Sequence, residues 1–138
     1  PFGNTVRVIE ITGADLQAAI EHGVAGHPTA VGKFPHVAGM TVTFDNKKAP
    51  GSRVTAITVA GQALVPTKIY RLATNDFLVA GGDAYTMFKG KKVVAEFGTM
   101  DQVLTDYMNK VGFEKAKLDG RMKEINTVVS FLIRLLAA

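Results

Sequence analysis

The chain has 138 residues, which is enough for one domain with a buried core. Its composition, 47% hydrophobic and 20% charged, is typical of a globular protein, and the absence of cysteine excludes disulfides, thiolate metal sites and cysteine nucleophiles. The net charge of +4 comes from scattered lysines rather than from an arginine-rich stripe, which argues against nucleic-acid binding.

The chain begins Pro1-Phe2-Gly3, with no initiator methionine and no signal segment. We therefore expect it to be a piece of a longer protein. The first element expected is a strand over Asn4–Ile11, where apolar residues surround Arg7 and Glu10. Thr12 can then cap a helix that ends near Gly23–Gly26.

The middle of the chain is predicted to be extended, with long connections. Pro28–Lys33 reads as a loop and Phe34–Ala38 as a short extended segment. A bulged loop is expected over Asp45–Ser52, because this connection between two strands is long for a hairpin. The strands predicted here are Met40–Phe44, Arg53–Val59 and Tyr70–Ala73.

The last third contains one strongly amphipathic helix. Thr99 and Gln102 provide capping chemistry at its start, and Gly112 ends it. Its apolar stripe is predicted to lie in the core; the stripe consists of Met100, Val103, Leu104, Tyr107, Met108 and Val111. Strands and helices together predict an α+β fold, with mixed β-sheet layers packed with helices in a single domain.

Two segments complete the chain. Glu114–Glu124 is charged and is predicted to be a loop or an extended arm. Residues 125–138 form an apolar, helical tail that is too short to span a bilayer, so no membrane partner is expected. The tail must then be buried against this chain or against another copy, which makes a homo-oligomer possible.

The segment Ala73–Gly90 is the most informative one for function. Phe77 stands in a region rich in turn residues, and Asp83 directly follows the pair Gly81-Gly82. Paired glycines allow close approach of another group, and an ionised aspartate only accepts hydrogen bonds. An aromatic face beside a fixed acceptor suits a nucleoside, although a purely structural turn with a core phenylalanine remains the alternative.

No self-contained catalytic centre is evident. The histidines His22, His27 and His36 lack the spacing of a shared metal site and are expected at the surface. Neither a phosphate-binding lysine loop nor a nucleophilic serine turn is present.

A set of motifs nevertheless occurs in a recognisable order. It comprises Pro1–Thr5, Gly32–Phe34, Pro50–Val54, Ala73–Leu78 and Gly81–Tyr85. This ordered set resembles the C-terminal, substrate-binding domain of the family that contains 5'-nucleotidases, UDP-sugar hydrolases and 2',3'-cyclic-nucleotide phosphodiesterases. The resemblance runs from Pro1 to about Met122. We expect residues 1–124 to form an N-terminally truncated domain of this kind, followed by the tail.

The resemblance implies a division of labour. In the family, an N-terminal metallophosphoesterase domain holds two divalent metal ions and the catalytic residues, and the C-terminal domain binds a nucleoside or nucleotide substrate. The chain alone is therefore expected to be inactive and to have no cofactor of its own. Its parent is expected to be a metal-dependent phosphoric ester hydrolase that is periplasmic, cell-wall-bound or secreted.

The resemblance also assigns roles to single residues. Phe2 and Phe77 match the aromatics that enclose the base, Asn4 and Gly32 match contacts near the base, and Asp83 matches the carboxylate that takes the ribose hydroxyls. Base stacking contributes about 1–3 kcal/mol per base.

Two departures from the family pattern are apparent. An upstream segment whose arginine contacts the substrate is absent, and Ala84 stands where glycine is common.

The alternative function is a self-associating structural module that uses the apolar tail.

Overall fold

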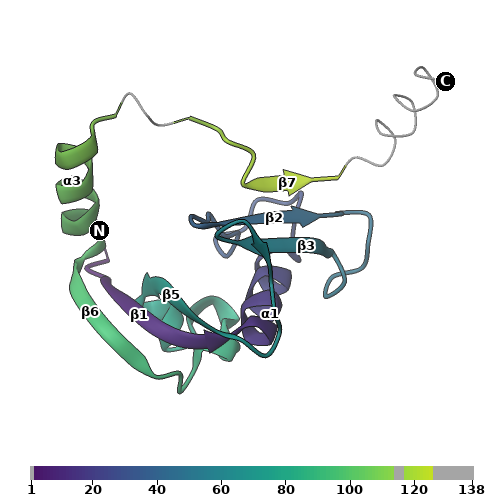
Figure 1. The fold of residues 1–138 in the computed structure, drawn as a ribbon, viewed down its shortest axis with the longest axis horizontal. Helices are drawn as coiled ribbons and strands as arrows, with labels where there is room; N and C mark the ends of the chain where they lie inside the picture. The colour runs from purple at the N-terminus through teal and green to yellow at the C-terminus, as the bar shows by residue number, and fades with distance from the viewer. Residues whose placement is uncertain (1, 114–116, 126–138) are drawn as a thin grey trace. The chain divides into compact units, whose positions relative to one another are not determined.

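A computed structural model describes residues 2–113 and 117–125 of the chain (Figure 1). Helices accompany both an antiparallel and a mixed sheet, which confirms the α+β fold class. In order, the elements are β1 (Thr5–Thr12), α1 (Gly13–Val24), β2 (Met40–Phe44), β3 (Val54–Val59), β4 (Gln62–Ala63), β5 (Ile69–Asn75), α2 (Asp76–Val79), η1 (Gly82–Ala84), η2 (Thr86–Phe88), β6 (Val93–Thr99), α3 (Met100–Val111) and β7 (Met122–Glu124).

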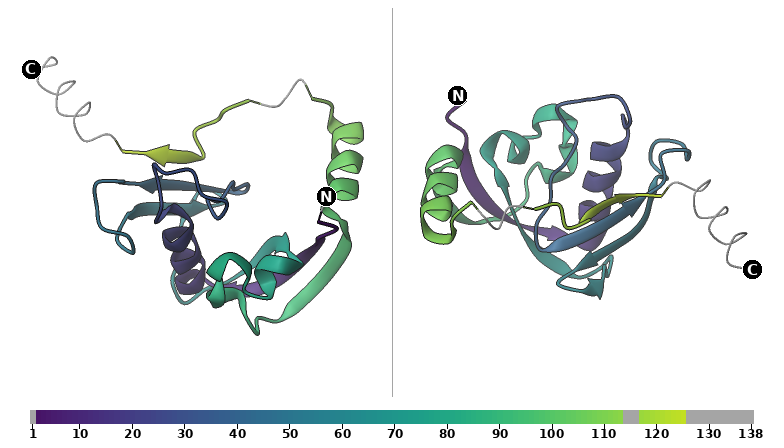
Figure 2. Two further views of the ribbon diagram at one scale, coloured as in Figure 1. Left: turned by 180° about the vertical axis from the view of Figure 1, so that it is seen from behind. Right: turned by 90° about the horizontal axis from the view of Figure 1, so that it is seen from above.

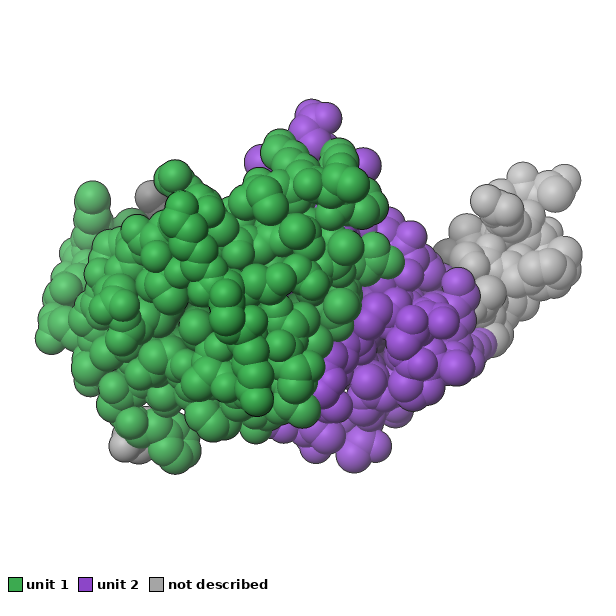
Figure 3. All heavy atoms as spheres, turned by 90° about the horizontal axis from the view of Figure 1, so that it is seen from below, with its two compact units in different colours: residues 1–19, 65–119 green, residues 20–64, 120–138 purple. Residues whose placement is uncertain are grey.

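The chain divides into two compact units, coloured separately in Figure 3. The first contains residues 1–19 and 65–119, and the second contains residues 20–64 and 120–138. None of the helices in the described ranges is long and apolar enough to cross a lipid bilayer.

The first unit is built on an antiparallel sheet of three strands in the order β5-β1-β6. Figure 2 shows β1 between its two neighbours. Val8 on β1 lies opposite Ala73 on β5 and Ala95 on β6. Ile9 and Ile11 are almost completely buried, so this central strand supplies the core of the unit.

The start of α1 confirms the predicted cap. The Thr12 hydroxyl accepts a hydrogen bond from the backbone N–H of Asp15 at 3.1 Å, which satisfies one of the helix's free donors. The Asp15 carboxylate accepts from Thr12 in return and forms an ion pair with Lys91. Two further donors, the N–H groups of Gly13 and Ala14, reach backbone carbonyls of the segment that precedes β5.

The second unit contains a mixed sheet in the order β4-β3-β2-β7. Strand β7 pairs with β2 in parallel. The other two pairings in the sheet, β2 with β3 and β3 with β4, are antiparallel. Buried apolar side chains from the end of α1 and from two strands form the core, namely Ile20, Val24, Val42, Phe44 and Ile57. Burial of each such side chain contributes about 1.5–3 kcal/mol.

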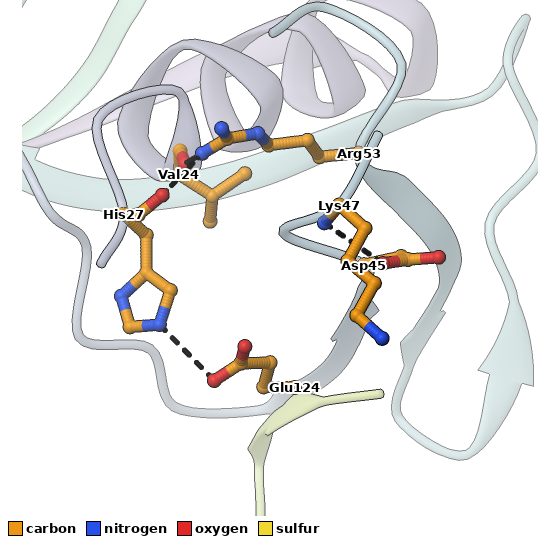
Figure 4. Close-up of polar contacts among 6 residues, drawn as sticks. All are labelled: Val24, His27, Asp45, Lys47, Arg53 and Glu124. Atoms are coloured by element: carbon orange, nitrogen blue, oxygen red, sulfur yellow. Dashed lines mark hydrogen bonds and ion pairs between the residues drawn. The ribbon is translucent and has the colours of Figure 1, made fainter. Parts of the chain in front are cut away.

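Buried Arg53 joins the end of α1 to the sheet of this unit (Figure 4). Its Nη1 donates to the backbone carbonyls of Val24 at 2.8 Å and of His27 at 2.7 Å. These contacts satisfy carbonyls that have no partner inside the helix and place a positive charge at the negative end of its dipole. His27, expected at the surface, is half-buried, and its Nε2 lies 3.1 Å from the carboxylate of Glu124.

The structure corrects several expectations. Strand β6 was not predicted, and the segment expected to be a loop or arm ends in the short strand β7. The α3 stripe was predicted to be core and this was wrong, because Leu104 is 57% exposed and Tyr107 is 62% exposed. The predicted tail lies, after Ile125, outside the described residues.

Replacement of Arg53 tests how much the end of α1 depends on it. We expect Arg53→Ala to lower the free energy of unfolding by about 2–4 kcal/mol, because the carbonyls of Val24 and His27 lose their bonds to the buried guanidinium group. Urea unfolding followed by circular dichroism measures the change. The matched control is Arg71→Ala at an exposed arginine, for which we expect less than about 1 kcal/mol. Equal effects of the two substitutions would contradict this role of Arg53.

Candidate functional site

The segment that the sequence singled out folds as a chain of short helical turns, α2, η1 and η2, after strand β5. Asn75 caps α2, because its Oδ1 accepts the backbone N–H of Leu78 at 2.8 Å. Backbone bonds from Ala80 to Asp76 and from Gly81 to Leu78 close the turn. The segment is therefore a series of hydrogen-bonded turns with defined side-chain directions.

Phe77 is at the surface rather than in the core, with 47% of its area exposed. Its ring packs directly over Gly82, so closely that a Cβ at this glycine would collide with three ring atoms. The glycine is needed here for close approach. The Phe77 ring is thus held against Gly82, the residue before Asp83. A ligand with a flat ring and a polar end would require such a pair of groups.

Asp83 is exposed and stands at the turn that follows the glycine pair. Its φ is 49°, and Ala84 follows at φ 62°, so two residues with side chains occupy the left-handed region. Each such residue costs on the order of 1–3 kcal/mol and is typical of functional sites. Ala84 therefore adopts a conformation that glycine would adopt without this cost.

Two buried aromatics follow this turn in the chain. The rings of Tyr85 and Phe88 stack with centroids 5.3 Å apart, and both residues are only 4% exposed. Burial, and to a lesser extent the negative charge of Asp83, raise the pKa of the Tyr85 phenol to about 12. The Asp83 carboxylate is thus held near a neutral phenol on a rigid base.

The N-terminal segment is attached to the same turns through Asn4. The Asn4 Nδ2 donates to Asp76 Oδ1 at 2.8 Å, which places this side chain beside the residue that precedes Phe77. Phe2, two residues earlier, is 89% exposed. Sequence reasoning did not single out Asp76 as a partner of Asn4. The signal available in the sequence was its position between the helix cap Asn75 and the aromatic Phe77.

The structure thus brings together the segments that carry four of the five predicted residues, Phe2, Asn4, Phe77 and Asp83. The fifth, Gly32, belongs to the second unit, where it is exposed in the loop before β2. Within residues 2–113 and 117–125, no group of three or more His, Asp or Glu side chains could hold a metal ion.

Comparison with known proteins identifies the family. A profile described as "5'-nucleotidase, C-terminal domain" matches residues 1–90. The 5'-nucleotidase of Diplobatis ommata is 34% identical over 131 residues, which cover 88% of this chain and 23% of that protein. The chain therefore belongs to the 5'-nucleotidase C-terminal domain family, and the resemblance is confirmed.

Further similarities agree with this assignment. The "Trifunctional nucleotide phosphoesterase protein YfkN" of Bacillus subtilis is 35% identical over 91% of this chain and 9% of its own length. The solved 5'-nucleotidase precursor of Thermus thermophilus superposes with a TM-score of 0.83 at 30% identity, over 91% of this chain and 26% of that one. The chain thus spans about a quarter or less of these three proteins.

The coupling between Asp83 and Tyr85 predicts a specific titration. We expect the ultraviolet absorbance of tyrosinate, followed through alkaline pH, to show one tyrosine that titrates near pH 12. This titration step should be missing in the variant Tyr85→Phe. Because this folded-state pKa lies above the ordinary value of 10.0, the stability it contributes is complete below pH 10 and is lost as pH rises toward 12.

The substitution Asp83→Asn should lower the pKa of Tyr85, because it removes the neighbouring negative charge. The matched control is Asp106→Asn, an exposed aspartate on α3, which should leave the titration unchanged. If Asp83→Asn also leaves it unchanged, the carboxylate does not lie where the structure places it.

Proposed function

We propose that this chain is the nucleotide-recognition domain of a 5'-nucleotidase-like phosphoesterase and that it binds the base and ribose of the substrate. The proposal is carried by one observation: the half-exposed ring of Phe77 is seated on Gly82, immediately before exposed Asp83. These two groups supply a stacking face and an anionic acceptor within a single turn.

The base is recognised by stacking. Phe77 offers one face, and Phe2 offers a second from the segment that Asn4 attaches to Asp76. Phe2 is 89% exposed and Phe77 is 47% exposed, so each ring has surface that a bound base could cover. Each base–aromatic contact contributes about 1–3 kcal/mol and accepts any base, so stacking sets affinity rather than selectivity. Gly32 remains a proposed backbone contact near the base.

The ribose is recognised by Asp83. A vicinal diol provides two hydroxyl donors, and an ionised carboxylate accepts from both in charge-assisted hydrogen bonds. The turn limits the freedom of the carboxylate before a ligand binds, since the backbone N–H of Tyr85 donates to the Gly82 carbonyl at 3.0 Å. The site therefore distinguishes a ribose from a sugar that lacks one of the two hydroxyls.

Catalysis belongs, in this proposal, to a part of the parent protein outside this chain. An N-terminal metallophosphoesterase domain with two divalent metal ions would hold the reacting phosphate, and this chain alone would be inactive. Relatives include snake venom 5'-nucleotidases, in keeping with a parent that works in the periplasm, in the cell wall or as a secreted protein. The alternative of a self-associating module depends on the tail, most of which lies outside the described residues.

Titration of the 138-residue chain with adenosine tests the proposal. We expect chemical shift changes in two-dimensional NMR spectra to centre on Phe77 and Asp83. The substitution Phe77→Ala should weaken binding by about 5-fold to 100-fold, because one stacking face is lost. The substitution Asp83→Asn should remove most of the preference for adenosine over 2'-deoxyadenosine.

The matched control for the aromatic is Phe97→Ala on β6, an exposed phenylalanine in the same unit. It should leave adenosine affinity unchanged. If the unsubstituted chain shows no adenosine binding at millimolar concentration, or if Phe77→Ala and Phe97→Ala behave alike, the proposal fails.

A further inference from the structure

One face of the three-stranded sheet in the first unit is apolar and exposed. The buried residues of β1, Ile9 and Ile11, lie on the other face, which carries the core of the unit. Successive side chains of a strand alternate between the two faces, so Val8 lies on the exposed one. Its cross-strand neighbours there are Ala73 on β5 and Ala95 on β6. The middle of this open face is therefore a row of short apolar side chains.

Two larger apolar residues extend the open face. Ile69 pairs with Thr12, which alternation places on this face, and Ile69 is 54% exposed. Phe97 follows Glu96, whose carboxylate pairs with Arg7 on the core face, so the Phe97 ring belongs to the open face. It is 56% exposed. Apolar surface gathered in this way is typical of an interaction site.

One end of the open face carries charge. Glu10 lies opposite Arg71, and the Nζ of Lys92 is 3.4 Å from the Oε2 of Glu10. Two cations therefore flank one carboxylate, and this end of the face is positive on balance.

Helix α3 is the second exposed apolar feature of the unit. None of its 12 residues is buried, and Leu104 and Tyr107 on its apolar stripe are more than half exposed. The charged residues of the helix are Asp101, Asp106 and Lys110, so the helix is negative on balance.

The open face and α3 complement each other in size and charge. A helix of 12 residues is about 18 Å long, and the seven residues of β5 span about 23 Å, so the helix fits along the face. The long side chains of Leu104 and Tyr107 would meet the short ones of Ala73 and Ala95, and large groups facing small ones fill space well. The negative helix also suits the positive end of the face.

A single copy keeps these two features apart. Strand β6 ends at Thr99 and α3 begins at Met100, so no connection lies between them in which the helix could turn back over its own sheet. A second copy has no such restriction.

We propose that two copies of this chain form a closed dimer, in which α3 of each copy packs on the open face of the other. Such a two-fold dimer contains the same helix-on-sheet contact twice. The repetition brings the covered surface toward the value of about 800 Å² per partner that is common in stable complexes. The open face and α3 contain none of the residues of the candidate nucleotide site, so the inference does not rest on the proposed function.

Sedimentation velocity of the 138-residue chain tests the dimer. Across a concentration range of about 1 μM to 1 mM, we expect the mass to rise from 14.7 kDa toward twice that value. Either Leu104→Glu on the helix or Ala73→Glu on the open face should weaken the dimer about 10-fold or more, because an unpaired carboxylate is buried in the contact. The matched control is Val65→Glu before β5, at a residue that is 47% exposed, and it should leave the dimer unchanged.

A mixture of the two variants tests which surfaces meet. In the dimer of Leu104→Glu, both contacts have a damaged helix, and in that of Ala73→Glu, both have a damaged face. A mixed dimer joins the intact helix of one variant to the intact face of the other, so one of its contacts is undamaged. We therefore expect the mixture to dimerise about 3-fold or more tightly than either variant alone.

The outcomes decide the proposal. A chain that stays monomeric at 1 mM overturns it, and so does a dimer that both Glu variants leave unchanged, as a dimer held by the tail would be. A mixture that dimerises no better than its components overturns the helix-on-sheet arrangement. Circular dichroism confirms that each variant is folded; if Ala73→Glu is not, Phe97→Glu on the same face replaces it, and an unchanged dimer in that variant contradicts the proposal.

Discussion

The hydrogen bonds to Asp76 Oδ1 are the interaction on which the candidate site depends. They connect the first residues of β1 to the first residues of α2, two places that are far apart in sequence. The antiparallel pairing of β1 with β5 brings them together, because Val6 lies opposite Asn75. A single carboxylate then ties Asn4 and Thr5 to the backbone of Phe77.

The candidate site contains backbone conformations that cost free energy in residues with side chains. Gly82 leaves room for the Phe77 ring, and Asp83 and Ala84 adopt positive φ values. The next residues along the chain, Tyr85 and Phe88, are buried and stack on each other. In the proposed function, groups set in this way before binding would lose little conformational entropy when a ligand arrives.

Local chemistry made part of this predictable from sequence. The cap at Thr12, the strand over β1 and the Phe77–Asp83 turn follow from neighbouring residues and were anticipated. Asp76 was missed because its partner lies 72 positions away, which no periodicity reveals. The apolar stripe of α3 showed that the helix has an apolar face but not whether another surface covers it, and the prediction that it is core failed for that reason.

The most direct test of the account is an NMR measurement of contacts between bound adenosine and the chain. The account predicts nuclear Overhauser effects from the base protons to the rings of both Phe2 and Phe77, because Asp76 holds the two segments together around the base. Effects to only one ring, or to residues outside this site, would contradict it.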